Sequence, residues 1–375
     1  MNMINTKELH YPNEPSRFET KDIDKLLAYC YQINASDITI QTGEPIVAEI
    51  YGRIFKLTRR SLSNSEVGNL LNSIYGPNGT TQLLRGNDVD THYEVRPNRN
   101  ERYRFRVNGT ACYVDGHEGI QITARSIPAD PPPLSWHELP DKIVHDIAPK
   151  EGVVYVTGAT GSGKSTLLAS IIKYIAEQKE SHRKILTYEA PIEFVYDSIQ
   201  SPTAIISQSE IPKHLPTFAA GVRNALRRKP HLILVGESRD PETMTAVLEA
   251  ALTGHPVYTT LHSNGVAETI RRLVNSFPHE ERMGRTIDII ETTRLIIWQQ
   301  LVPSVDGKRV ALREYLVFNE FIRDQLLAQD PVQITAATRK LVPEYGQLME
   351  VDVKQKYKQG LLSERTYKIL MASLA

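Results

Sequence analysis

The stretch 158–166, with the sequence GATGSGKST, constrains the fold more than any other part of the chain. The apolar run VVYVT (153–157) precedes it, and a pattern typical of a helix follows through Lys179. A strand, a glycine-rich loop and a helix in this order match the phosphate-binding pattern G-x-x-x-x-G-K-[ST]. The stretch therefore predicts a nucleotide-binding α/β domain rather than an isolated glycine-rich turn.

Each residue type in this loop suits a triphosphate. Glycines adopt positive φ without a Cβ penalty, so successive backbone N–H groups can turn inward as an anion-binding nest, and the following helix adds its positive dipole end. We expect Lys164 to reach the β- and γ-phosphates of ATP and the Ser165 hydroxyl to hold Mg²⁺, whereas Thr166 caps or packs. The expected nucleotide-binding residues are Gly158, Ala159, Thr160, Gly161, Ser162, Gly163, Lys164, Ser165 and Thr166.

The second half of the chain alternates short apolar strands with helices. The expected strands are 153–157, 184–189, 232–236 and 257–261, and the expected helices are 165–179, 216–229, 241–252 and 265–276. This alternation predicts a mostly parallel sheet covered on both faces. A helix-like stretch (281–294), a hairpin-like pair around 303–308 and a helical tail follow.

The first half has a different pattern. A helix is expected over 20–34 with Thr20 as a possible N-cap, paired strands over 38–57, a helix over 63–75 and further strands over 90–127, which together indicate a smaller α+β domain. The sequence IPADPPP (127–133) favours an extended linker. We therefore expect an N-terminal extension (1–19), a first domain (20–127), a proline-rich linker (128–139) and an ATPase domain with a helical C-terminal region (140–375).

Composition excludes some classes of protein. Lys+Arg and Asp+Glu both number 44 and the sequence pI is about 7.2, so no global basic field favours a nucleic-acid partner. No apolar run of signal-peptide or membrane-helix length occurs, which predicts a cytoplasmic protein without a membrane span. Cys30 and Cys112 are lone and far apart, and we expect both to be small buried hydrophobes.

Parallel strands would bring several polar residues to one edge of the sheet. Glu189, Glu237 and His262 each follow an apolar strand, and ligands bind at the carboxyl ends of strands in such sheets. Gly236 occupies the position where many phosphate-loop ATPases carry the aspartate that supports the metal, so Glu237 is the expected residue that orients or deprotonates the attacking water. Glu189 is favoured over Glu193 as a carboxylate that holds Mg²⁺ through water, and Glu193 could be a solvated loop residue.

The two histidines near the fourth strand receive different expectations. His262 at the carboxyl end could sense the γ-phosphate. His255 precedes the same strand, and the intervening residues place it roughly 16 Å or more away, so it cannot share a same-subunit site with His262. A surface role for His255 stays open beside a functional one.

The nucleotide half offers no arginine that spacing places over the γ-phosphate. The first half offers Arg102, Arg104 and Arg106 on one face of a strand, with Arg125 just before the linker. If one of these acts as an arginine finger in trans, the active unit is an oligomer. The same face could also be plain solvated surface.

With these motifs the chain resembles the PilT/VirB11-type family of secretion and pilus-motor ATPases, in the GspE/PilT superfamily, from about residue 20 to its end. The motifs are ASDITI (35–40), YRFRVN (103–108), ARSIP (124–128), GATGSGKST, TYEAPIEF (187–194), LILVGESRD (232–240), TGHPVYTTLH (253–262) and the tail GQLMEVDVKQKYKQGLLSERTYKIL. The resemblance implies a PAS-like first domain, a RecA-like second domain and a hexameric ring. It also implies roles for an acidic box (Glu189, Glu193), for Glu237, for a histidine box (His255, His262) and for Arg104, Arg106 and Arg125.

Two departures narrow the resemblance. Ala190 stands where the acidic box usually has aspartate, and LRRKPH (226–231) lacks the acidic residues typical of pilus motors. With these two departures and its overall length, the chain resembles the ATPases of Dot/Icm type IVB secretion systems. A PilT-like pilus retraction motor is the alternative. The resemblance implies recruitment to a secretion-machine base at the inner membrane, through a DotO-like ATPase. A nucleotide-gated scaffold with little turnover stays open because of Ala190, whereas no Asn-Lys-x-Asp motif supports a GTPase.

Overall fold

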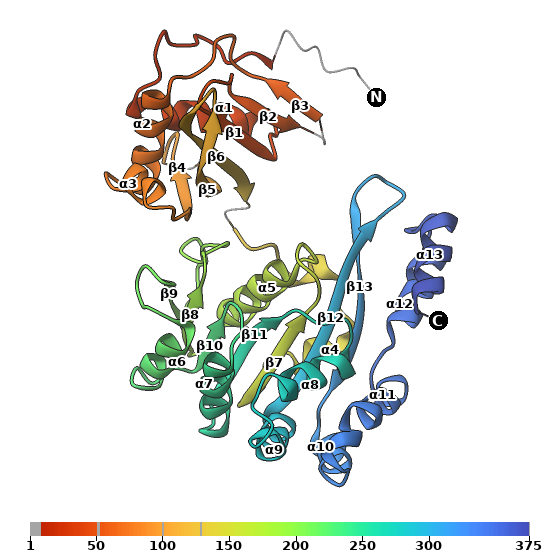
Figure 1. Ribbon diagram of the computed structural model, residues 1–375. Coiled ribbons are helices and arrows are strands. Elements are labelled where there is room, and N and C mark those ends of the chain that lie inside the picture. The colour runs from red at the N-terminus through yellow and green to blue at the C-terminus, as the bar shows by residue number, and fades with distance from the viewer. Residues whose placement is uncertain (1–8, 51–52, 100, 128–129, 375) are drawn as a thin grey trace. The chain divides into compact units, whose positions relative to one another are not determined.

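The computed structural model describes residues 9–50, 53–99, 101–127 and 130–374. The chain folds as two compact units, Met1–Asp130 together with Glu193–Val195, and Pro131–Ile192 together with Tyr196–Ala375. The expected N-terminal extension and linker fall partly on residues 1–8 and 128–129, which lie outside the described residues. Figure 1 shows the elements of each unit.

The first unit is built on an antiparallel sheet. Among its described residues six strands pair in the order β3-β2-β1-β6-β5-β4. The strands are β1 (Asp37–Gln41), β2 (Val47–Ile50), β3 (Arg53–Lys56), β4 (Val89–Val95), β5 (Tyr103–Val114) and β6 (His117–Ile127). The helices are α1 (Ile23–Gln32), α2 (Asn64–Tyr75) and α3 (Gly79–Leu84), after a 3₁₀ turn at Thr20–Asp22.

Alternation of apolar residues forms the sheet as expected, because successive side chains in a strand point to opposite faces. Tyr103, Phe105 and Val107 of β5 are buried in the core of this unit. Two details differ from expectation. Thr20 is not an N-cap, since the 3₁₀ turn is capped by Glu19, and Cys112 is half-buried where Cys30 is fully buried.

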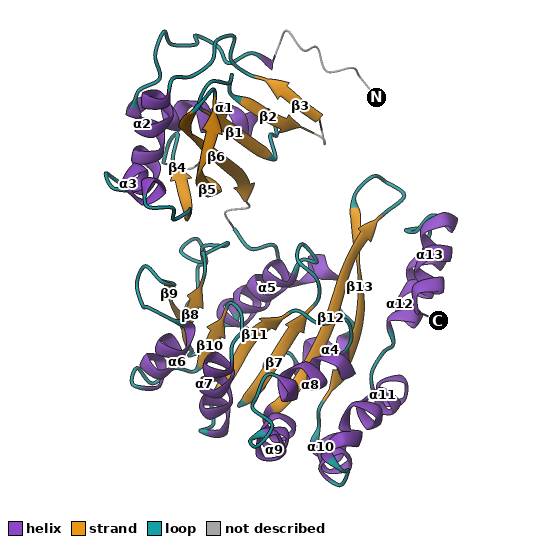
Figure 2. Cartoon of the chain, in the orientation of Figure 1, coloured by secondary structure: helices purple, strands orange, loops and turns teal. Residues whose placement is uncertain are grey.

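The second unit is built on a mixed, mostly parallel sheet, as Figure 2 shows. In the part that the structure describes, seven strands pair in the order β13-β12-β7-β11-β10-β8-β9. They are β7 (Gly152–Thr157), β8 (Lys184–Glu189), β9 (Ile205–Glu210), β10 (Leu232–Val235), β11 (Pro256–Leu261), β12 (Thr293–Pro303) and β13 (Arg309–Val317). Only β13 runs antiparallel to its neighbour within this described sheet.

Helices and short turns complete this unit. The helices are α4 (Asp141–Asp146), α5 (Lys164–Glu177), α6 (Phe218–Leu226), α7 (Pro241–Leu252), α8 (Val266–Asn275), α9 (Arg282–Thr292), α10 (Glu320–Leu327), α11 (Ile334–Tyr345), α12 (Met349–Lys358) and α13 (Glu364–Leu374). Short 3₁₀ turns occupy Leu134–His137 and Pro331–Gln333. Within the described residues, no helix combines the length and the apolarity that a bilayer-spanning segment requires.

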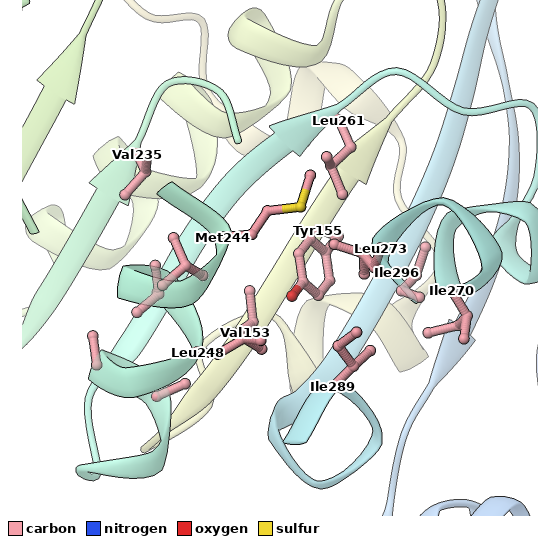
Figure 3. Packing of buried hydrophobic residues seen from close by; sticks show 14 of the residues in the cluster. Val153, Tyr155, Val235, Met244, Leu248, Leu261, Ile270, Leu273, Ile289 and Ile296 are labelled. Atoms are coloured by element: carbon pink, nitrogen blue, oxygen red, sulfur yellow. The ribbon is translucent and has the colours of Figure 1, made fainter. Parts of the chain in front are cut away.

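Alternate residues of the central strands pack under different helices. Val153 and Tyr155 of β7 lie in one core with residues of α7, α8 and α9, as Figure 3 shows. Val154 and Val156 are also buried but lie outside that core, and α5 contacts β7. Because helices cover both faces of the sheet, the sequences of its central strands are continuous apolar runs. This confirms the α/β fold class expected from the sequence.

Local chemistry explains the boundaries that differ. Helix α6 ends at Leu226 rather than at the expected residue 229, because Lys229 precedes Pro230 and has a φ of 50°, outside the helical region. Strand β9 was not expected, because its sequence IISQSE carries four polar residues at an edge position. The expected helix 281–294 ends at Thr292, where the β-rich sequence TRLIIW begins β12.

Candidate nucleotide-binding and catalytic site

The loop between β7 and α5 has the backbone that its glycines predict. Gly158, Gly161 and Gly163 have φ angles of 144°, 77° and 82°, in the region that side chains disfavour. A Cβ at Gly158 would lie 2.3 Å from the carbonyl oxygen of Gln299, so no larger residue fits there. The loop is therefore shaped by close approach to β12 as well as by its own turns.

Lys164 begins α5 and is 8% exposed. Its ammonium donates to the carbonyl oxygens of Gly158 and Ala159, at 2.9 and 2.8 Å, which satisfies a buried charge within the loop. Ser162 is also buried, and its hydroxyl has no hydrogen-bond partner among the described residues. A positive helix end, a glycine cradle and an unpartnered hydroxyl are features that fit a bound polyphosphate.

The remaining loop residues are more accessible. Ala159, Thr160 and Gly161 are exposed, and Ser165 and Thr166 are half-buried on the first turn of α5. Within the described residues, no group of three or more His, Cys, Asp or Glu side chains could hold a metal ion. Mg²⁺ usually keeps several waters and takes few protein ligands beside substrate phosphates, so the Ser165 hydroxyl suits that ion.

The parallel register brings the expected strand ends to one edge. Strand β7 pairs with β11, β11 with β10 and β10 with β8, all in parallel. The backbone N–H of Gly236 donates to the Tyr188 carbonyl at 2.8 Å, which fixes the turn that carries Glu237 beside the end of β8. Glu189, Glu237 and His262 thus follow neighbouring strands at the edge where the glycine-rich loop lies.

Glu237 is held between two basic side chains. His262 Nε2 lies 3.2 Å from Glu237 Oε1, and the Arg239 guanidinium pairs with the same oxygen. Burial and the nearby Lys164 ammonium lower the pKa of His262 below its ordinary value, although Glu237 opposes the shift. The imidazole is consequently neutral at neutral pH. The sequence motifs assign no role to Arg239, although its spacing of two residues from Glu237 is a signal that could have found it.

Glu189 and Glu193 have different surroundings. Glu189 is 8% exposed, and its Oε1 accepts hydrogen bonds from Thr187 Oγ1 at 2.6 Å and Gln208 Nε2 at 3.0 Å. Glu193 lies in a three-residue segment that belongs to the first unit, where its carbonyl accepts from Arg104 Nη1 at 2.6 Å. Gln208 was missed because β9 was missed.

His255 sits at the other end of β11 from His262. Its Nδ1 lies 3.2 Å from both the Ala250 carbonyl and the Thr253 hydroxyl, which are at the end of α7. The whole of β11 separates the two imidazoles in the chain, as expected.

The first-unit arginines are not one solvated surface. Arg104 is 1% exposed, whereas the Arg106 and Arg125 side chains are 43% and 67% exposed and pair with Asp90 and Asp37, each at 2.8 Å. Arg102 pairs with Glu94 at 3.5 Å. The alternative of a plain solvated face is therefore wrong at Arg104, because the polar atoms around it allow burial of the charge.

A cavity of about 390 Å³ adjoins the start of α5. Gly163 and Thr166 line it together with residues of the 134–138 segment, β12, β13, the loop between these strands, and α12 with the turn after it. Trp136 and Leu301 give it apolar surface, and Lys308 and Lys356 give it charge. No sequence motif predicts this cavity, because its walls come from segments as far apart as Trp136 and Leu361.

Residues 89–365 match the model of a protein family described as Type II/IV secretion system protein. The chain belongs to this family. The match confirms the predicted GspE/PilT superfamily, and relatives named as ATPases show that the chain is a P-loop ATPase of the secretion and pilus-motor kind.

Individual relatives agree with the family assignment. The chain is similar to the crystal structure of the ATPase DotB from Legionella pneumophila, with 66% identity, 97% of this chain and 99% of that chain covered, and a TM-score of 0.91. It is 33% identical to the type IV pilus retraction ATPase PilT of Pseudomonas aeruginosa over 91% of this chain and 96% of that protein. A crystal structure of the pilus retraction motor PilT with bound ADP is 34% identical, covers 92% of this chain and 95% of that chain, and has a TM-score of 0.79.

Proposed function

We propose that this chain is the subunit of a homohexameric cytoplasmic ATPase that hydrolyses MgATP and converts hydrolysis into motion between its two units. The motion would energise type IVB (Dot/Icm) protein secretion. The observation that carries the proposal is the Glu237–His262 pair at the same sheet edge as the GATGSGKST loop. The 66% identity to the Legionella pneumophila DotB structure over nearly the whole chain supports the choice of secretion system.

Nucleotide binding follows from the loop. The backbone N–H groups and the α5 N-terminus would hold the phosphates, and Lys164 would exchange its two loop carbonyls for β- and γ-phosphate oxygens. The Ser165 hydroxyl would hold Mg²⁺, which neutralises phosphate charge when bound. The cavity beside Thr166 has the position and the partly apolar lining that an adenosine group needs.

Catalysis would centre on Glu237. A carboxylate at this edge can orient a water for in-line attack and accept its proton. His262, kept neutral, can donate to the γ-phosphate or to Glu237 without adding a full charge. Glu189 is oriented by Thr187 and Gln208 and would assist through a water on the metal.

The ring would be recruited from the cytoplasm to a secretion-machine base at the inner membrane, through a DotO-like ATPase, with no nucleic acid involved. The balanced charge of the chain supports a protein partner over a nucleic acid. A PilT-like pilus retraction motor is the second candidate, because the similarity to PilT covers nearly the whole of both chains. Deletion of the gene separates the two, since it would abolish effector export in one case and twitching in the other.

The enzymatic proposal is tested by steady-state ATPase assays. We expect Lys164→Ala to lose nucleotide binding, and Glu237→Gln to keep binding while turnover falls by roughly a hundredfold or more. Glu242→Gln is the matched control, because Glu242 is exposed on α7 and pairs with Arg223 of α6. Full turnover in Glu237→Gln would contradict the assigned role.

A further inference from the structure

Gln299 of β12 contacts the nucleotide loop and also lines the adjoining cavity. Its side chain is 1% exposed, and its Nε2 donates to the Ser162 carbonyl at 2.6 Å. Its own carbonyl oxygen is the atom that approaches Gly158, and its Nε2 is the nearest atom to a Cβ built on Gly163. One residue therefore contacts the loop at its first glycine and at its last turn.

The direction of the Ser162 carbonyl matters for anion binding. In a planar trans peptide the C=O and the following N–H point in opposite directions. When Gln299 draws the Ser162 oxygen toward β12, the N–H of Gly163 is turned toward the other side of that peptide. A nest requires successive N–H groups on its concave side, so this hydrogen bond helps to set the phosphate-binding shape.

Arg313 of β13 fixes the orientation of the Gln299 amide. Its Nε donates to Gln299 Oε1 at 2.8 Å, and its Nη1 donates to the His137 carbonyl at 2.8 Å. A guanidinium can only donate and a carbonyl can only accept, so the amide has one arrangement that satisfies both neighbours. Arg313 is 4% exposed, and its backbone N–H donates to Asp352 of α12 at 2.7 Å, which anchors it in turn.

We propose that Gln299, oriented by Arg313, is a positioning residue for nucleotide binding by the GATGSGKST loop. The inference rests on the proposed function of that loop. The hydrogen bond shapes the loop itself and supports ground state and transition state alike, so its loss weakens binding rather than the chemical step. The KM for ATP should rise while kcat changes little.

The decisive variant is Gln299→Glu. Glutamate keeps the size of the side chain and the bond from Arg313, but its carboxylate cannot donate to the Ser162 carbonyl. We expect the Kd for MgADP, measured by titration calorimetry, to rise at least about tenfold, because one well-formed hydrogen bond is lost and a carboxylate faces the Ser162 carbonyl. Gln299→Met, which loses both bonds without adding a charge, should raise the Kd about tenfold, and kcat should stay within about twofold in both variants.

Gln300→Met is the matched control, because Gln300 is the next residue of β12 and is half-buried. Unchanged MgADP affinity in Gln299→Glu would overturn the proposal, as would an equal loss in Gln300→Met. An unchanged KM with a large fall in kcat would overturn it too. If the proposed function itself were wrong, the wild-type chain would bind no MgADP and would give the same titration as Lys164→Ala.

Discussion

His262 is kept neutral by its position at the end of β11. Burial and the Lys164 ammonium lower its pKa, so protonation requires a lower pH than for a histidine in water. A charged imidazole 3.2 Å from Glu237 would make that carboxylate a poorer base.

The pH profile of turnover should report this arrangement. We expect kcat to be constant between about pH 7 and 8, and to fall on the acid side as His262 gains its proton. His262→Gln should lack that part of the acid-side fall, whereas His279→Gln, at an exposed position, should retain it. An identical fall of kcat at low pH in the wild type, His262→Gln and His279→Gln would refute the assignment to His262.

His137 should make stability depend on pH. Its Nε2 lies 2.8 Å from Ser170 Oγ on α5, and burial together with Arg313 lowers its pKa to about 4. The unfolded chain, with a histidine pKa of about 6.5, binds this proton first as the pH falls. The contribution of neutral His137 to the free energy of unfolding is therefore fully present above about pH 6.5. It is lost as the pH falls toward about 4, by up to roughly 3 kcal/mol.

Urea unfolding at neutral pH and at about pH 5 measures this effect. The wild-type midpoint should fall further than that of His137→Gln, because the glutamine has no proton to gain. Carboxylates elsewhere titrate equally in both proteins, so the difference between them isolates His137. Equal falls in the two proteins would contradict the assignment.

At the scale of elements, helices of the second unit differ in how closely they pack. Gly221 lies inside α6, and a Cβ there would meet the Tyr188 ring at 2.6 Å, whereas a Cβ at Gly284 in α9 would meet nothing within 4 Å. Tyr188 is fully buried on β8, so it cannot move aside without disturbing the core.

A glycine-to-alanine substitution should therefore lower stability in α6 and raise it in α9. Gly221→Ala should destabilise the second unit by about 1–3 kcal/mol, because overpacking outweighs the gain in helix propensity. Gly284→Ala should stabilise it by roughly 0.5–1 kcal/mol, because the backbone entropy of glycine is removed at no steric cost. Thermal unfolding of both variants measures the difference, and two shifts of the same sign would be inconsistent with this packing.

The parts of the fold that were predictable are those with local signals. The run VVYVT before the glycine-rich loop and the glycines themselves predict β7, the loop and the start of α5. Glu237 and His262 were predictable as neighbours because parallel strands share an edge. These inferences need only periodicity and strand order.

The residues that were missed are defined by contacts between distant segments. Gln299 contacts the glycine-rich loop from 137 residues away in the chain, and Arg313 contacts the 134–137 turn from 176 residues away. In the sequence both look like ordinary polar residues of a strand. Arg104 sits on an alternating strand that predicts an exposed side chain, yet it is buried because a carbonyl and Glu94 lie close to it. Burial of a polar residue depends on partners that periodicity does not reveal.

At the scale of the whole molecule, the second unit holds the loop and Glu237, while exposed arginines lie on the first unit. Arg106 and Arg125 are register partners on β5 and β6, and both are accessible. The proposal of a hexamer therefore makes a specific prediction, that one subunit supplies this pair to the nucleotide of its neighbour.

Mixing two inactive proteins tests that prediction. Glu237→Gln subunits keep the arginines but have dead sites, and Arg106→Ala/Arg125→Ala subunits keep their sites but lack the arginines. In a random equal mixture, roughly a quarter of the interfaces would join an intact site to intact arginines, so turnover should recover to about that share of wild type. Arg85→Ala, at another exposed position of the first unit, should be fully active alone. The two variants are dissociated and reassembled together before the assay. If the mixture is only as active as the sum of the two variants, the arginines do not act across subunits. An arginine that serves its own site could not be supplied by a neighbour.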